Sequence, residues 1–521
     1  MKIRFLLLVF VVIWATGLHF GHSQKPSRKK IEKWSEKALP TAIGELVNFM
    51  AIANDGNYPE QIEENLNWCK VVFAELDFET KILETDGAPL LYAESKNHNT
   101  DKSILFYLQI DGQPVDTLAW NQPNPYKAVF KHRTAENEWN MLPKDFQKSG
   151  FNMDWRIFGR SASDSKGPAI AFINALRILK EKNIIVPYTV KVIMDFQEEL
   201  GSPSLPAAVN RYRELLEANA ILVMDGTRHL SNLPTLTFGA RGIATATIRV
   251  FGPRKALHSG QYGNVAPNPV FEASRLLTSL KDEDGRVAIP SFYDGISLNE
   301  DEKRRLNAVP EDLEQIKKRL GIAQIEAIGE TYQEALQYPT LNVRGLNAAW
   351  VGKEVRTLIP EEVVIEIDMR LVPESDGERL MQLLRKHIIG QGFHLADSIP
   401  TDKERAEHRK LASFKYRLGS KPFRTSFDAP IASMLNHAMQ RIFDDRFIAM
   451  RTTGGSQPIA PFINTLEVDA VSVRIPNPDN SIHAPNENLR IGNFLEGIMT
   501  NLSILTEPFD SKLPQGRPTW H

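Results

Sequence analysis

Strand-like and helix-like segments alternate along the first half of the chain. Apolar, strand-like runs occupy residues 103–111, 188–196 and 220–225, and helical patterns occupy residues 167–183 and 205–219. Strands that follow one another through crossover helices form a parallel sheet with both faces covered. We therefore predict an α/β fold with a mostly parallel, doubly wound sheet.

A second pattern begins near residue 243. The segments "GIATATIRVFG" and "VVIEIDMRLV" alternate apolar and polar residues, as strands do when one face of a sheet meets solvent. The first pattern returns near residue 426. We predict a catalytic domain of residues 24–242 and 426–521, with an α+β domain of residues 243–425 inserted in it. The long polar segment 120–156 is expected to be a functional loop.

The N-terminus has the pattern of a targeting signal. Lys2 and Arg4 precede an apolar run that ends near Leu18 and is followed by small residues. This pattern is typical of a secretory signal peptide, here residues 1–23. We expect a secreted or periplasmic protein, and a membrane anchor formed by an uncleaved N-terminus is the alternative.

Charge and cysteine content exclude several classes of function. The 521 residues carry a formal net charge of −2, so there is no electrostatic reason to expect nucleic acid as a partner. Cys69 is the single cysteine. An intrachain disulfide and a cysteine-based metal site are therefore excluded.

Acidic residues and a histidine follow the predicted strands. The carboxyl ends of parallel strands meet at one crevice, where several carboxylates repel one another unless cations neutralise them. Any one of these acids could instead cap the next helix, but the set predicts a metal site. The residues are Asp111, Asp164, Glu198, Glu199, Asp225 and His483.

The order of these motifs resembles a known family. The series "QIDGQP", "GRSASDSKGP", "QEELGS", "VMDG", "LHSGQYGN", "MRLVP", "GGSQP" and "SIHAPNE" runs from about residue 100 to about residue 490. It is similar to the dinuclear-zinc family of carnosinase-type dipeptidases, aminoacylases, acetylornithine deacetylase and glutamate carboxypeptidase. The form "LHSGQYGN" favours the dipeptidase branch.

The resemblance implies two divalent metal ions, zinc as in the family, with manganese or cobalt as alternatives. Asp164 would bridge the ions, Glu199 and His483 would complete one site, and Asp225 would join the other. Glu198 would be the general base that takes a proton from the metal-bridging water. The fold implied is a zinc exopeptidase-like catalytic domain with an inserted lid that also forms a homodimer contact.

Further roles follow from the same resemblance. His258 would stabilise the oxyanion, and in dimeric relatives this histidine reaches in from the neighbouring subunit. Read without the family, His258 could be a turn residue and Arg370 a surface charge. The residues expected to hold the substrate carboxylate are Arg370, Gly454, Gly455 and Ser456.

Gln109 departs from the family pattern. The relatives have a histidine here that binds a metal, and an aspartate two residues later that orients it; Asp111 keeps that position. We expect Gln109 to place its carbonyl oxygen on the metal while its NH₂ group donates to Asp111. An amide oxygen is a weaker zinc ligand than imidazole, so one metal site is expected to be weak.

The implied function is a secreted metal-dependent hydrolase that cleaves an amide next to a free carboxylate, most simply a dipeptidase or short-peptide exopeptidase. A deacylase of N-acyl amino acids, with the same catalytic residues and another pocket, is the first alternative. A non-catalytic peptide- or metal-binding protein, suggested by Gln109, is the second.

Overall fold

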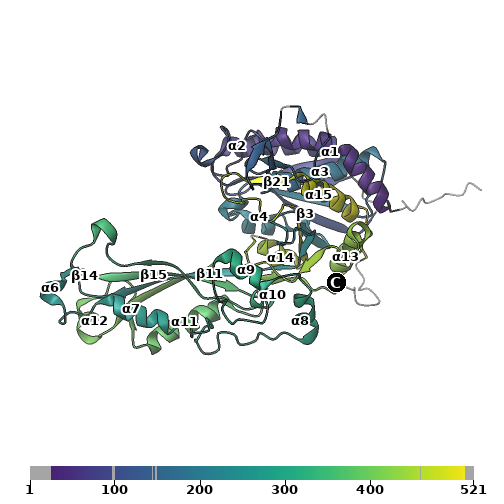
Figure 1. Ribbon diagram of the computed structural model, residues 1–521. Helices are drawn as coiled ribbons and strands as arrows, with labels where there is room; N and C mark the ends of the chain where they lie inside the picture. Colours follow the sequence, from purple (N-terminus) through teal and green to yellow (C-terminus); the bar gives the residue numbers. More distant parts are fainter. Residues whose placement is uncertain (1–24, 97–99, 144, 147–149, 458, 511–521) are drawn as a thin grey trace, which may run out of the picture.

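A computed structural model describes residues 25–96, 100–143, 145–146, 150–457 and 459–510. The chain forms a large α/β domain and an elongated arm that extends from one side of it (Figure 1). The predicted signal peptide lies outside the described residues. Within the described residues, we find no helix with the length and apolar content needed to cross a membrane.

An eight-stranded sheet forms the centre of the large domain. Its four middle strands, β7, β3, β8 and β20, pair in parallel, and antiparallel pairs flank them. This arrangement confirms the predicted α/β class. In spatial order the strands are β1 (Phe78–Leu83), β2 (Leu90–Ser95), β7 (Thr189–Asp195), β3 (Ser103–Gln109), β8 (Ala220–Val223), β20 (Ala470–Arg474), β9 (Thr235–Thr237) and β19 (Ile448–Met450).

Helices cover both faces of this sheet, and the side chains of β3 show why. Phe106 and Leu108 belong to one apolar core, whereas Leu105 and Tyr107 belong to the core on the opposite face. A strand with two buried faces is expected to be apolar throughout. The first core holds α1 (Arg28–Met50), α2 (Pro59–Glu75), α3 (Lys166–Glu181), α13 (Pro430–Phe443) and α15 (Ile491–Leu505); the second holds α4 (Leu205–Arg211), α5 (Arg213–Leu216) and α14 (Ala460–Leu466).

Two expectations for the large domain are wrong. The helix predicted over 205–219 breaks at Tyr212, where the side chains of Arg211 and Tyr212 both donate to the carbonyl of Glu84. The predicted loop 120–156 contains strands, because its apolar residues join a small sheet with a late segment of the chain. That sheet has the order β21 (Asn488–Arg490), β6 (Arg156–Phe158), β4 (Val129–Arg133) and β5 (Trp139–Met141).

The arm is built on a second, five-stranded sheet. Its long central strands alternate buried and half-buried residues, so the predicted solvated face is confirmed. Helices α7 (Pro269–Thr278) and α11 (Gly377–Gly390) contribute to its separate apolar core. The strand order is β13 (Asn342–Asn347), β15 (Glu362–Leu371), β11 (Gly242–Phe251), β17 (Leu411–Leu418) and β16 (His394–Leu395).

Shorter elements occupy the two ends of the arm (Figure 1). At the junction, β10 (Gly239–Ala240) pairs with β18 (Phe423–Arg424). Near the large domain lie α8 (Glu300–Asn307), α9 (Leu313–Leu320) and α10 (Tyr332–Ala335). The far end carries β12 (Leu257–His258), α6 (Ser259–Tyr262), β14 (Leu358–Ile359) and α12 (Asp402–Glu407).

Candidate active site

Most of the predicted metal-binding residues come from loops at the carboxyl ends of the parallel strands. Asp111 follows β3, the short 3₁₀-helix Glu198–Leu200 follows β7, and Asp225 follows β8. Asp164 lies just before α3, and His483 lies between β20 and β21. The structure therefore brings these separate segments to one edge of the sheet, as the strand order requires.

Asp164, Glu199 and His483 form a compact cluster. Their ligating atoms all lie within 4.8 Å of one another. His483 Nε2 is 3.0 Å from Asp164 Oδ2 and 3.2 Å from Glu199 Oε2, and these carboxylates raise the pKa of His483 to about 10. Glu199 Oε1 is buried and has no hydrogen-bond partner among the described residues. Two carboxylates, an imidazole and a free buried oxygen fit a divalent cation such as zinc.

Asp225 lies beside this cluster rather than in it. The hydroxyl of Ser165 donates to Asp164 Oδ1 at 3.0 Å and lies 2.9 Å from Asp225 Oδ1. Burial raises the pKa of Asp225, and so does the nearby Asp164. Two carboxylates that share one hydroxyl and repel each other fit a second cation, with Asp164 common to both sites.

Gln109 is buried at the end of β3, but the hydrogen bond predicted from it to Asp111 is absent. Asp111 Oδ1 and Oδ2 instead accept the backbone N–H groups of Glu198 and Glu199, each at 3.0 Å. Gln109 Nε2 has no hydrogen-bond partner among the residues that the structure describes. The expectation is wrong because the turn after β7 folds over Asp111 and takes both carboxylate oxygens.

Glu198 has the surroundings of a base. Burial raises its pKa well above the usual value, and the carboxylates of Asp225 and Asp164 add to the shift. The two backbone bonds from its turn to Asp111 fix its position. Gln113 Nε2 holds the adjacent Glu199 by donating to Oε2 at 2.8 Å. The two neighbouring glutamates therefore differ in position, because Glu199 belongs to the metal cluster and Glu198 does not.

Glu487 is an important residue that the sequence reasoning missed. It is fully buried and accepts the backbone N–H groups of Ser161, Ser163 and Asp164 at 2.8–2.9 Å. Arg160 Nη1 donates to it at 2.8 Å. It thereby fixes the loop that presents Asp164. The motif "SIHAPNE" contains Glu487, but an acid in a loop gives no sign of such a role.

The predicted carboxylate-binding residues meet at the junction with the arm. Arg370 Nη1 donates to Ser456 Oγ at 2.8 Å, which joins β15 to the glycine-rich loop of residues 454–457. Arg241, which the sequence reasoning also missed, donates from Nε to the Gly454 carbonyl and from its backbone N–H to the Gly455 carbonyl, each at 3.2 Å. Arg241 follows β10 directly, so it links the loop to the start of the arm.

His258 lies apart from these residues within the same chain. It is exposed, and its Nδ1 accepts the backbone N–H of Gly260 at 3.0 Å, which caps α6. Figure 1 shows α6 at the far end of the arm, away from β3 and α4. The fold of one chain therefore does not bring His258 to the acidic cluster.

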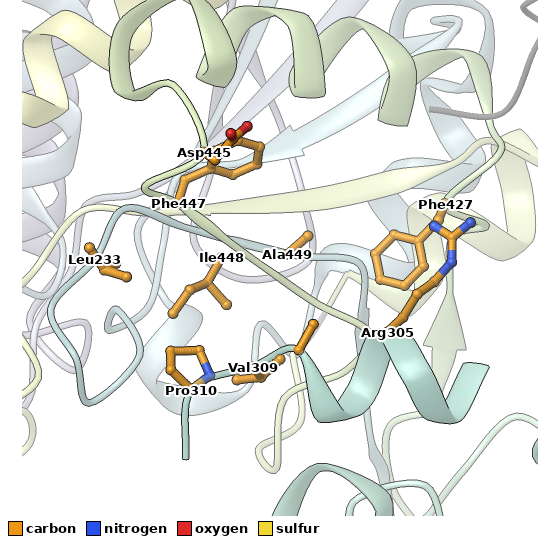
Figure 2. A pocket seen from close by; sticks show the side chains of 10 residues that line it. Leu233, Arg305, Val309, Pro310, Phe427, Asp445, Phe447, Ile448 and Ala449 are labelled. Atoms are coloured by element: carbon orange, nitrogen blue, oxygen red, sulfur yellow. The ribbon is translucent and has the colours of Figure 1, made fainter. Parts of the chain in front are cut away.

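A small cavity elsewhere has a different character. Figure 2 shows this cavity of about 150 Å³, between the end of α8 and β19. Its lining is largely apolar, with Arg305 stacked on Phe427 at 5.4 Å from Cζ to the ring centroid. None of the predicted site residues, all of which are described, lines it. The residues around this cavity pack the arm segment against the large domain, and the cavity has no part in the candidate site.

Comparison with known proteins agrees with this geometry. Residues 238–392 match the M20 peptidase dimerisation domain. An M20 family metallo-carboxypeptidase from Sulfolobus solfataricus superimposes with a TM-score of 0.72 and 26% identity, over 89% of this chain and 98% of that one. Over most of its length the chain is similar to M20 family metallopeptidases in sequence and in fold. The family resemblance read from the motifs is therefore confirmed.

Other M20 relatives cover most of the chain. A Cys-Gly metallodipeptidase of Schizosaccharomyces pombe is 26% identical over 79% of this chain and 80% of its own length. The human beta-Ala-His dipeptidase is 25% identical over 90% of this chain and 86% of its own length. The crystal structure of human carnosine dipeptidase 1 has a TM-score of 0.70 at 20% identity, covering 92% of this chain and 98% of that one.

Proposed function

We propose that this protein is a dipeptidase or short-peptide exopeptidase that requires two divalent metal ions, with zinc as the natural metal. The observation that carries the proposal is the cluster of Asp164, Glu199 and His483 with Glu198 beside it. The names of the M20 relatives, a Cys-Gly metallodipeptidase and a beta-Ala-His dipeptidase, support a dipeptide substrate.

The residues divide the work of amide hydrolysis. Asp164, Glu199 and His483 would hold one ion, and Asp164, Asp225 and Gln109 the other. Such ions supply Lewis acidity, which makes water acidic enough to attack an amide near neutral pH. Glu198, with its raised pKa, takes the proton from the attacking water and delivers it to the departing nitrogen.

Binding of the substrate carboxylate falls to the junction between the domains. Arg370 presents a planar guanidinium, which suits a carboxylate, and Ser456 fixes its orientation. Gly454 and Gly455 allow the substrate to approach the loop backbone closely. This subsite explains why the proposed substrates end in a free carboxylate.

A homodimer completes the proposed site. His258 is exposed at the far end of the arm, and the segment that carries it matches a dimerisation domain. We propose that the partner subunit's His258 stabilises the oxyanion of the reacting amide. Export is also part of the proposal, with residues 1–23 as a signal peptide; N-terminal sequencing of the protein isolated from its native source tests it.

The deciding experiment combines metal analysis with a substrate panel. Purified protein is loaded with zinc, manganese or cobalt and assayed on dipeptides and on N-acyl amino acids. We expect two ions per chain, hydrolysis of dipeptides, and loss of activity with a chelator. Preference for N-acyl amino acids would make the protein a deacylase. Binding of dipeptides without hydrolysis under all three metals would leave only the non-catalytic alternative.

A further inference from the structure

A cavity of about 480 Å³ lies at the inner end of the arm, lined by α9, α10, the segment between them and parts of segments 281–293 and 339–341. Its lining is mainly apolar and includes Ile316, Ile328, Tyr332 and Leu336. Tyr332 is 42% exposed, so part of this apolar lining is open to solvent. A pocket of this size and composition is typical of a small-molecule site.

One end of the cavity lies next to the glycine-rich loop. Arg241 and Leu336 both line the cavity. A Cβ atom on Gly454 would lie 3.5 Å from Arg241 Nη2 and 3.6 Å from Leu336 Cδ2, so Gly454 lies against two residues of the cavity wall. The same loop reaches the sheet through Gln457, which accepts the hydroxyl of Ser472 on β20 at 3.2 Å.

The loop thus leads from the cavity toward the metal-binding residues. Ser472 pairs with Val223 in the parallel ladder between β20 and β8. Asp225 lies two residues beyond Val223, at the end of that strand. A peptide bound along the loop can therefore have its amide near Asp225 and its C-terminal residue near Arg241.

Two arginines face the loop without acidic partners. Arg241 and Arg370 make no ion pair with any carboxylate in the described part of the chain, and their charged groups contact the loop at Gly454 and Ser456. Burial lowers the pKa of Arg241 to about 10, and repulsion from Arg370 adds to the shift. Neighbouring guanidinium groups of this kind are stabilised when they share an anion.

We propose that Arg241 and Arg370 together bind the substrate's terminal carboxylate, and that the cavity receives the side chain of the C-terminal residue. The enzyme then prefers dipeptides that end in a large apolar residue. Basic residues are disfavoured, because Arg241 and Arg319 line the cavity, and its lining acid Glu326 is already paired with Lys281 at 2.7 Å. This inference rests on the proposed function, since it names the substrate class for that site.

The first test compares dipeptides with one N-terminal residue. We expect kcat/KM for Ala-Phe and Ala-Leu to exceed that for Ala-Gly and Ala-Lys by about 10- to 100-fold, the range for filling an apolar pocket. Ala335→Phe narrows the cavity from its wall and should reduce the Ala-Phe to Ala-Gly ratio about 10-fold. Ile185→Ala, an exposed change beyond α3, should leave the ratio unchanged. A wild-type ratio near 1, or one that Ala335→Phe does not change, overturns the inference.

The role of Arg241 needs a readout that loop damage alone would not change. We expect wild-type enzyme to favour Ala-Phe over its C-terminal amide, and Arg241→Met to reduce this preference about 10-fold or more, with Arg241→Lys retaining part of it. A purely structural role for Arg241 would lower both rates equally and leave the preference intact. That result would remove Arg241 from the carboxylate subsite.

Binding separates the two levels of the proposal. L-phenylalanine and glycine are titrated into the wild-type protein by calorimetry, with phenethylamine as the ligand that lacks a carboxylate. Stronger binding of phenylalanine, weakened by Ala335→Phe, supports the pocket even if no dipeptide is hydrolysed, in which case only the proposed function fails. Hydrolysis without this pattern retains the function and overturns the pocket. If the protein shows no hydrolysis of dipeptides and no binding of phenylalanine, both the proposed function and the pocket are overturned.

Discussion

The acidic cluster and the far end of the arm are built in opposite ways. Around Asp164, buried groups fix the loops that carry the acids: Glu487 holds the Asp164 loop, Ser165 connects Asp164 to Asp225, and Asp111 holds the turn that carries Glu198. His258 is exposed, and its side chain accepts a single bond from Gly260 in its own turn.

The difference shows which half of the chemistry one chain can complete alone. Metal binding and proton transfer need positions fixed to fractions of an ångström, which a buried network provides. An exposed histidine on a short turn gains a fixed position only when another surface packs against it. The predictions below test whether the two regions are as different as their contacts indicate.

The largest effect is expected at Glu198. Glu198→Gln keeps the size of the side chain but removes the base, so kcat should fall by about 10²- to 10⁴-fold while metal content stays the same. Steady-state kinetics and metal analysis on the same preparation measure both. Glu214→Gln, in the short helix α5, is the matched control. Turnover that survives Glu198→Gln would assign the base to another group.

Glu487 should matter almost as much, but through structure. Glu487→Ala leaves Arg160 buried without its partner and frees the three backbone N–H groups of the Asp164 loop. Breaking a buried pair in this way typically costs about 3–5 kcal/mol in unfolding free energy. Chemical denaturation measures the loss, and metal titration should show weaker binding. If metal affinity is unchanged when the protein remains folded, Glu487 does not position Asp164.

These two residues also show how far sequence reasoning extends. Glu198, Glu199 and His483 were predictable because strand ends in a parallel sheet converge, whatever the details of the loops, whereas Asp164 follows β6 of the small antiparallel sheet. Glu487 was not, because its role depends on a contact with Arg160, 327 positions away in the chain. The expected bond between Gln109 and Asp111 failed for a similar reason, since the distant turn after β7 takes the carboxylate.

The arm shows the same limit. Its strands β11 and β15 were predictable from alternation, which is a local property of the sequence. The cavity beside Arg241 was not, because the segment between α9 and α10 has no regular period and the cavity depends on how this segment packs against the rest of the arm. Periodic patterns indicate elements, whereas contacts between irregular segments must be observed.

The far end of the arm gives the third prediction. If the partner subunit's His258 stabilises the oxyanion, His258→Ala should reduce kcat by about 10²- to 10³-fold without changing metal content. His408→Ala, also in the arm, is the control. Mixing His258→Ala subunits with Glu198→Gln subunits should restore activity, because each mixed dimer holds one site with both residues intact. Confirmed subunit exchange without recovery would show that His258 does not act across a dimer.

The smallest effect is expected at Gln109, a buried residue of the proposed metal site. Gln109 is 1% exposed, and its Nε2 atom lacks a partner among the described residues. A buried amide group without a partner costs about 1–3 kcal/mol, so Gln109 is a poor residue for packing alone. As a metal ligand it would offer a neutral oxygen, which holds zinc less tightly than imidazole does.

The site shared by Gln109, Asp164 and Asp225 should therefore release its ion first when a chelator is added, in the earlier of two steps. Gln109→His should raise the affinity of that site for its ion, and Gln109→Ala should lower it, each by about 10- to 100-fold. Competition with a chromophoric chelator measures the dissociation constants of both metal sites. Gln382→His in the arm controls for a new surface histidine. If neither substitution changes the first step, Gln109 does not bind the metal. The cluster of Asp164, Glu199 and His483 would then hold one tightly bound ion, and the network around Asp225 would serve to position Asp164.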